Sequence, residues 1–219
     1  MLRLCLILSS LLVLFPTNAA QRDNNSCGII AGQSLTNAYG PWDYTNPNHQ
    51  DKLPIVIGAH FSRQVASLTK GITGITPHGD IDYTLRAIPN HHHALWSAAK
   101  LEAKDKLRLT NGDTFSPRYY TANCYFKRAI YFQPKDHVTR MLYAMFLQKS
   151  SDYKQALEQY NIALSIQPKD PEVNYNLGLL YVEIKQLEKA EAHAKIAYAA
   201  GHPLLGLKNK VSKLKSSLH

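Results

Sequence analysis

The sequence predicts a mainly α-helical protein built from stacked antiparallel helix hairpins, and three observations support this prediction. The tetrapeptide QPKD occurs twice, which places Pro134 and Pro168 34 residues apart. A period of this length indicates stacked two-helix units. Alanines recur with the same period, at Ala122, Ala156 and Ala190 and again at Ala129, Ala163 and Ala197. In DYKQALEQYNIALSI the apolar residues have the spacing of one helix face.

Residues 137–170 and 171–202 resemble the tetratricopeptide repeat family, whose unit is a 34-residue helix–turn–helix. The first unit matches the family pattern at Tyr143, Ala144, Leu147, Ala156, Tyr160, Ala163 and Pro168. The second matches it at Leu177, Gly178, Tyr181, Ala190 and Ala197. It departs from the pattern at two places. Ala194 stands where a large aromatic residue is usual, and Gly201-His202-Pro203 stands where the closing proline of the family falls. The resemblance implies a helical solenoid.

An irregular first unit is predicted over 90–136. SPRYYTANCYFKRAIYFQP has the pattern of a second helix, and HHHALWSAAKLEAKDKL is expected to be its partner, with Asn111-Gly112-Asp113 in an extended turn. These units make about three repeats, which is the number that a stable solenoid needs. Residues 203–219 are expected to form a helix that caps the last unit. Binding of this basic amphipathic helix to a membrane surface is the alternative.

The start of the chain has the layout of a secretory signal peptide over residues 1–20. Arg3 precedes an apolar run, and small residues follow at Thr17, Ala19 and Ala20, so cleavage is expected after Ala19 or Ala20. The apolar run is short for a membrane span, although an uncleaved anchor is the alternative. We therefore expect an exported protein, periplasmic or extracellular, with no transmembrane segment in its mature chain.

Two cysteines, Cys27 and Cys124, remain after removal of residues 1–20. In an oxidising compartment they are expected to form one disulfide that ties the N-terminal segment to the repeats, with two free thiols as the alternative. The mature charge of +8, after loss of Arg3, raises the question of nucleic-acid binding. No face that combines basic and aromatic residues is evident, so no nucleic-acid partner is expected.

Residues 21–89 contain no repeat and read as a loop-rich segment with one short helix. Ser62 is a candidate N-cap for RQVASLTK, and Gly71 is a candidate stop. LPIVIGAHF is compatible with a short strand or a helix, and ITGITPHGDIDYTL reads as turn-rich chain. The stretch DIDYTLRAIPNHHHAL resembles a segment of exported bacterial tetratricopeptide proteins, which implies no activity.

The histidine-rich stretch raises the possibility of a metal site. Asn90 is expected to be an N-cap, which puts the three histidines in the first helical turn, where they should be neutral at pH 7. Consecutive helical residues diverge by about 100°, so three in a row do not close on one ion. The candidate ligands for a transition metal are His60, His78, Asp80, Asp82, His91, His92 and His93. A structural role, with an acid such as Asp82 paired to Arg86, is the competing interpretation.

The favoured function is a non-catalytic scaffold or adaptor of the cell envelope that binds a protein or peptide partner. The chain contains no nucleophile elbow, phosphate loop, zinc-metalloprotease pair or dinucleotide fingerprint, so no catalytic residue and no cofactor is expected. The family resemblance implies a concave peptide groove lined by Val138, Met141, Met145, Gln148, Lys149, Glu172, Tyr175, Leu179, Val182 and Glu183. A metal-binding protein or an enzyme, with its site in the N-terminal segment, is the alternative.

Overall fold

The computed structural model describes residues 23–110 and 118–217. The proposed signal peptide and the turn expected at Asn111-Gly112-Asp113 lie outside these residues. The described chain contains helices and no strands. A short 3₁₀ helix, η1, spans Pro47–His49, and the α-helices are α1 Leu53–His60, α2 Arg63–Ala66, α3 His78–Ala87, α4 His92–Thr110, α5 Ala122–Phe132, α6 His137–Lys149, α7 Tyr153–Ile166, α8 Pro171–Glu183, α9 Leu187–Ala199 and α10 Gly206–Ser216.

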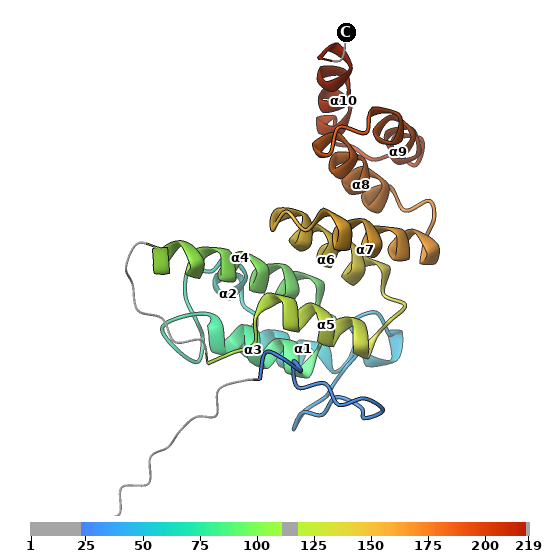
Figure 1. Cartoon of the computed structure of the whole chain (residues 1–219). Helices are drawn as coiled ribbons and strands as arrows, with labels where there is room; N and C mark the ends of the chain where they lie inside the picture. Colours follow the sequence, from blue (N-terminus) through green and yellow to red (C-terminus); the bar gives the residue numbers. More distant parts are fainter. Residues whose placement is uncertain (1–22, 111–117, 218–219) are drawn as a thin grey trace, which may run out of the picture.

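The helices stack as antiparallel hairpins in chain order, which confirms the predicted solenoid. Three-residue turns join α6 to α7 and α8 to α9. Figure 1 shows the succession from the N-terminal helices α1 to α4 at one end of the molecule to α8, α9 and α10 at the other. One continuous apolar core contains buried residues from Phe61, which directly follows α1, to Ala190 on α9.

The hairpins pack closely because small residues face each other where the helices approach. Ala144 on α6 and Ala156 on α7 have no exposed surface, and Tyr160 fills the space beside them. The phenol of Tyr160 donates a hydrogen bond to Gln148 Oε1 at 3.2 Å, so its polar end is satisfied inside the core. A larger side chain at either alanine would force the helices apart.

The second helices α5 and α7 end in the same turn, and α3 ends in the same way. Gln133 and Gln167, after α5 and α7, have φ, ψ of −131°, 83° and −136°, 83°. Ile88, after α3, has −136°, 79°. In all three turns a proline follows, because this extended conformation is the one that a residue before proline prefers. The turn after α3 is therefore an inter-repeat turn, and α3 has the position of a second helix in a preceding, degenerate unit.

The prediction of a loop-rich segment over 21–89 with one short helix was wrong for residues 78–87. This stretch forms α3, and Ile81 and Leu85, one helical turn apart, are each only 1% exposed. Thr84 lies at the helix position where the later units have the small residues Ala129 and Ala163. Its hydroxyl donates to the Asp80 carbonyl at 2.7 Å. The bond satisfies the buried hydroxyl, so a polar residue is tolerated there. LPIVIGAHF is also helical, as α1.

The C-terminal helix α10 packs on α8 and α9. Leu207 is fully buried, and its methyl groups lie so close to Gly178 that a Cβ there would come within 2.6 Å of one of them. Ala194, where the family usually has a large aromatic, belongs to the same apolar cluster. α10 therefore covers the end of the last repeat, as a capping helix does.

A disulfide joins Cys27 to Cys124 across 97 residues. Hydrogen bonds reinforce this attachment of the N-terminal segment to α5. Thr121 N donates to Asn24 Oδ1 at 2.8 Å, and Arg128 donates to the Cys27 carbonyl at 3.0 Å. The first part of the described chain is thus fixed along α5, on the outer side of the repeats. In the described ranges, no helix combines the length and apolarity that crossing a membrane requires.

Replacing Cys27 and Cys124 by serine is expected to lower the free energy of unfolding by about 4 kcal/mol, because the disulfide restricts a long loop of the unfolded chain. Urea denaturation of the oxidised wild type, the reduced wild type and the double variant measures this. A reduced wild type as stable as the oxidised protein would contradict the expectation.

Candidate functional site

An open groove runs between α4 and α6. The two helices run in the same direction, since their N-terminal ends meet through His92 and Asp136 and their later turns line common hollows. One hollow of about 350 Å³ is lined by Ala66, His92, His93, Trp96, Ser97, Lys100, Val138 and Leu142. A second, of about 450 Å³, continues along the helices and is lined by Trp96, Ala99, Lys100, Glu102, Ala103, Lys106, Phe146, Lys149 and Ser150.

Trp96 occupies the centre of this groove, because it lines both hollows. Its position follows from the repeat register: with His92 equivalent to His137, Trp96 on α4 corresponds to Met141 on α6. Lys149 extends over the indole, with its Nζ 4.7 Å from the ring centroid. This cation–π contact holds an ammonium group at the rim of an apolar surface.

The lining of the groove is positively charged. Lys100, Lys106 and Lys149 are exposed, whereas Glu102 is the one carboxylate among the lining residues. Glu102 is already engaged, as Lys106 Nζ lies 2.8 Å from its Oε1. The groove thus combines a large aromatic surface with excess positive charge, which suits an acidic segment carrying an apolar side chain.

The five groove residues predicted on α6 have different environments. Val138 lines the groove, and Lys149 covers Trp96. Met145 packs, partly buried, on the apolar core. Met141 is only 6% exposed and contacts the Asn176 amide, and Gln148 donates to Glu183 at 2.7 Å.

The five residues predicted on α8 differ in exposure: the C-terminal segment covers Tyr175 and Leu179, whereas Glu172 and Glu183 are exposed. The Tyr175 ring stacks on His202 with 3.8 Å between centroids, and Glu172 accepts from the same imidazole at 3.0 Å. Leu179 and Val182 pack against the cluster around Leu207, and Glu183 bonds to Gln148 and Tyr153. The hollows of the groove lie between α4 and α6, so the prediction for α8 stays a prediction.

Sequence reasoning missed the α4 side of the groove. Trp96 and Lys100 were not among the predicted lining residues, and neither were Leu142 and Phe146 on α6. The signal was available, because the register that aligns His92 with His137 places Trp96 and Lys100 at the positions of Met141 and Met145. The prediction carried the family positions only onto the two regular units.

A buried polar network holds the N-terminal ends of α4 and α6 together. Asn90, which is completely buried, donates from Nδ2 to Asp43 at 2.8 Å and to Asp136 at 3.0 Å. Its Oδ1 accepts from Tyr44 N at 2.9 Å, so both the oxygen and the nitrogen of the side-chain amide are hydrogen-bonded. His92 Nε2 lies 2.8 Å from Asp136 Oδ2. We call Asp43, Asn90, His92 and Asp136 the junction.

The junction carboxylates are stabilised in their ionised form. Burial by itself raises the pKa of Asp136, but bonds from His92, the Thr139 amide and Asn90 outweigh it and hold this pKa below its ordinary value. Asp43 behaves similarly: burial opposes ionisation, yet bonds from Thr45, Asn90 and Gln133 lower its pKa. Asp136 also caps α6 by accepting from Thr139 N, so the same carboxylate starts a helix and joins two units.

The N-cap of α4 is His91, not Asn90 as predicted. Its Nδ1 accepts from the Ala94 amide at 3.1 Å, which requires an unprotonated nitrogen at that position. Burial, together with the nearby His93, lowers the pKa of His91 to about 4. The expectation of a neutral imidazole at the start of this helix fits this geometry for His91. Asn90 instead lies in the preceding turn and serves the junction.

The seven candidate metal ligands are distributed among separate contacts. His60 lies 3.1 Å from Asp80, His78 2.8 Å from Asp105, and His92 2.8 Å from Asp136. Asp82 pairs with Arg86 at 2.9 Å and accepts from Tyr125, as expected of a structural ion pair. His91 is buried, and His93 is exposed. Over 23–110 and 118–217, no three His, Cys, Asp or Glu side chains are grouped so that they could hold a metal ion.

Asp80 fixes the loop before α3. Its carboxylate accepts from the backbone amides of Ile72 and Thr73 and from the Thr73 hydroxyl. Burial opposes the charge, but these bonds and the one from His60 lower the pKa of Asp80. A fully buried acid with this many donors is a structural anchor of the N-terminal segment.

A family model described as TPR repeat matches residues 148–185, from the end of α6 through α8. The stacked hairpins agree with this match, so this part of the chain is similar to tetratricopeptide repeats. A search of curated proteins found no match to the chain.

Acidification is expected to destabilise the fold through His91. The unfolded chain, with an imidazole pKa of 6.5 against about 4 in the fold, takes up the proton first as the pH falls. The free energy of unfolding should therefore decrease between pH 6.5 and pH 4, with His91 contributing up to about 3 kcal/mol. Urea denaturation across this range measures it.

His91→Asn retains a good N-cap residue and should lose most of this part of the pH dependence. The exposed His93→Asn is the matched control and should retain it. An unchanged slope in His91→Asn would show that the buried imidazole is not its source.

Proposed function

We propose that this protein is an exported scaffold of the cell envelope that binds an acidic, partly apolar segment of a partner protein in the groove between α4 and α6. The observation that carries the proposal is Trp96 in an open groove, between Lys100 and Lys149. Aromatic side chains in such pockets supply much of the binding energy of protein interfaces. The lysines select the sign of the partner's charge.

The geometry favours an extended or helical peptide over a small molecule. The two hollows share Trp96 and Lys100, so they form one elongated groove along α4 and α6. Phe146 and Leu142 give this groove apolar sites on both sides of the indole. A segment with one apolar anchor and flanking Asp or Glu would place the anchor beside Trp96 and its carboxylates near the lysines.

The groove proposal is tested with a fluorescein-labelled acidic peptide that contains Leu and Phe, and with a second peptide in which Lys replaces each acid. Fluorescence anisotropy is expected to show that the acidic peptide binds at least about tenfold more tightly. Trp96→Ala and Lys149→Glu should each weaken this binding by about tenfold or more.

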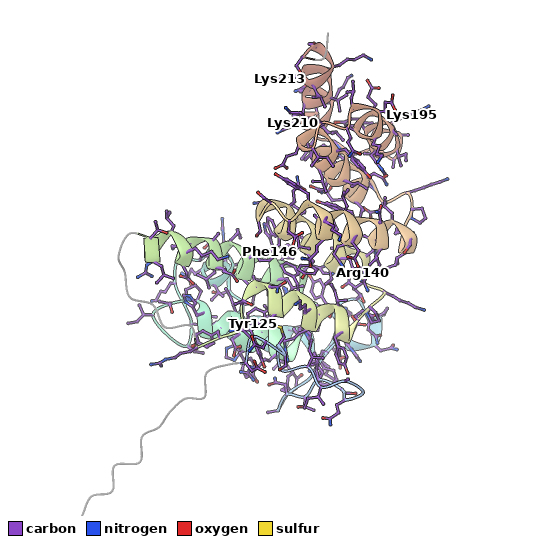
Figure 2. The ribbon with its side chains drawn as sticks, in the orientation of Figure 1. Tyr125, Arg140, Phe146, Lys195, Lys210 and Lys213 are labelled. Atoms are coloured by element: carbon purple, nitrogen blue, oxygen red, sulfur yellow. A yellow bond between two sulfur atoms is a disulfide. The ribbon has the colours of Figure 1, made fainter. Side chains whose placement is uncertain are left out.

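Lys195→Glu is the control variant, because Lys195 is an exposed lysine on α9, remote from the groove (Figure 2). It makes the same change in net charge and should alter the affinity by less than about twofold. Equal affinity for both peptides, or equal losses in Lys149→Glu and Lys195→Glu, would refute the groove as the binding site.

Export rests on the layout of residues 1–20 and is consistent with the Cys27–Cys124 disulfide, since such bonds persist in oxidising compartments. N-terminal sequencing of the native protein should begin at Ala20 or Gln21. A native protein that begins at Met1 and is recovered with reduced cysteines would contradict export.

A further inference from the structure

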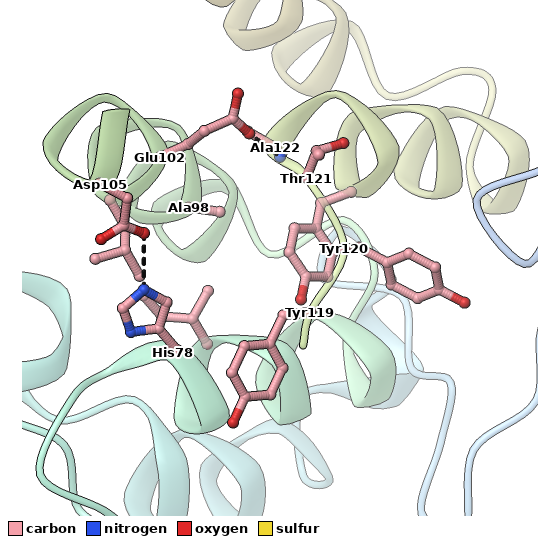
Figure 3. Close-up of a pocket in the computed structure, with 11 residues that line it drawn as sticks. His78, Ala98, Glu102, Asp105, Tyr119, Tyr120, Thr121 and Ala122 are labelled. Carbon is pink, nitrogen blue, oxygen red and sulfur yellow. Dashed lines mark hydrogen bonds and ion pairs between the residues drawn. The ribbon is translucent and has the colours of Figure 1, made fainter. Parts of the chain in front are cut away.

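A second, smaller cavity lies between α3, α4 and the start of α5, separate from the peptide groove. Its volume is about 90 Å³, which exceeds the space of a single water several-fold. Figure 3 shows His78 and Asp105 on one side of it and the segment from Tyr119 to Ala122 on the other. Its lining residues are His78, Ile81, Ala98, Leu101, Glu102, Asp105, Tyr119, Tyr120, Thr121, Ala122 and Tyr125.

The cavity exists because α4 and α5 do not close as a tight hairpin. Eleven residues separate α4 from α5, whereas three separate the helices of each regular unit. Ala122 corresponds to Ala156 and Ala190, which are covered by their partner helices. Ala122 and Ala98 are also buried, but both line the cavity. The small residues that allow close packing elsewhere leave room for a ligand in this unit.

The lining combines an apolar interior with carboxylates and aromatic rings. Asp105, 9% exposed, accepts a hydrogen bond from His78 through Oδ2. Glu102 Oε2 accepts from the Ala122 amide at 2.6 Å, which caps the start of α5. Among the residues that the structure describes, no lysine or arginine lines the cavity. Lys106 contacts Glu102 from the exposed side, with its own side chain 66% exposed.

Three tyrosines, Tyr119, Tyr120 and Tyr125, supply aromatic surface to the same cavity. The Tyr119 ring is stacked with His78, with centroids 6.1 Å apart. Ring faces attract cations, and a carboxylate in a low-dielectric cavity attracts them more strongly than one in water. The negative lining and the aromatic walls thus favour the same sign of ligand charge.

We propose that this cavity binds a small organic ammonium ion with an apolar body. The ammonium lies at Asp105, and the apolar body contacts Ile81, Ala98 and Leu101. This site is distinct from the peptide groove and takes a ligand of opposite charge. The two sites meet at Glu102, which lines both cavities.

The test is isothermal titration of the full oxidised chain with 2-phenylethylammonium chloride and, separately, with uncharged 2-phenylethanol. The ammonium is expected to bind at least about tenfold more tightly than the alcohol, because the two share an apolar body and differ in charge. Failure to bind the ammonium, or equal binding of both compounds, would overturn the proposal.

Variants separate the role of the cavity from general effects. Asp105→Asn should weaken binding of the ammonium by about tenfold or more. Ala98→Leu should abolish it by filling the cavity, and its circular dichroism should remain that of the wild type.

Glu191→Gln, which removes an acid on α9 that also has a lysine partner, is the control and should bind as the wild type does. Retained binding in both Asp105→Asn and Ala98→Leu would place the ligand elsewhere and refute the site. The peptide affinity of the groove is measured in the same variants. It distinguishes a failure of the proposed ammonium site from a failure of the proposed peptide groove.

Discussion

The Asp136 carboxylate is the interaction on which the rest of this structure depends. It starts α6 by accepting from the Thr139 amide at 3.1 Å, and it binds His92 at the start of α4 and Asn90 in the turn before it. Through Asn90 it is linked to Asp43 and thus to the N-terminal segment. One buried acid, 4% exposed, therefore connects a helix start, two repeats and the segment that precedes them. Removing one partner would leave a buried charge uncompensated, which is costly.

The position of the groove follows from where this junction holds the helices. It fixes the N-terminal ends of α4 and α6, and the groove opens along the turns that follow. At the other end of the solenoid α10 packs on α8, whereas an open groove lies beside Trp96. A related contact recurs one unit later, where His137 lies 3.2 Å from Asp170, the N-cap of α8. A histidine–acid contact thus joins successive first helices at both places.

The regular part of the fold could be predicted from the sequence because its signals are local and repeated. Tyr160, Ala163 and Pro168 specify a second helix and its end by spacing alone. Helix α3 was not predicted, because Gly79 and Pro77 suggested a turn. The burial of Ile81 and Leu85 in the apolar core stabilises a helix there instead. The coverage of Tyr175 by His202 and the partnership of Asn90 with Asp43 depend on residues far apart in the chain. No local pattern encodes such contacts, so the true extent of the groove needed the structure.

The central claim is that the N-terminal helices and the repeats form one cooperative solenoid joined at Asp136. Native-state hydrogen exchange tests it most directly, because it gives a free energy of opening for each helix. The account predicts that amides of α3 and α4 exchange with the same free energy as those of α6, and that Asn90→Ala lowers both together. Exchange of α3 and α4 at a clearly lower free energy than α6, unaffected by Asn90→Ala, would show two independent units and contradict it.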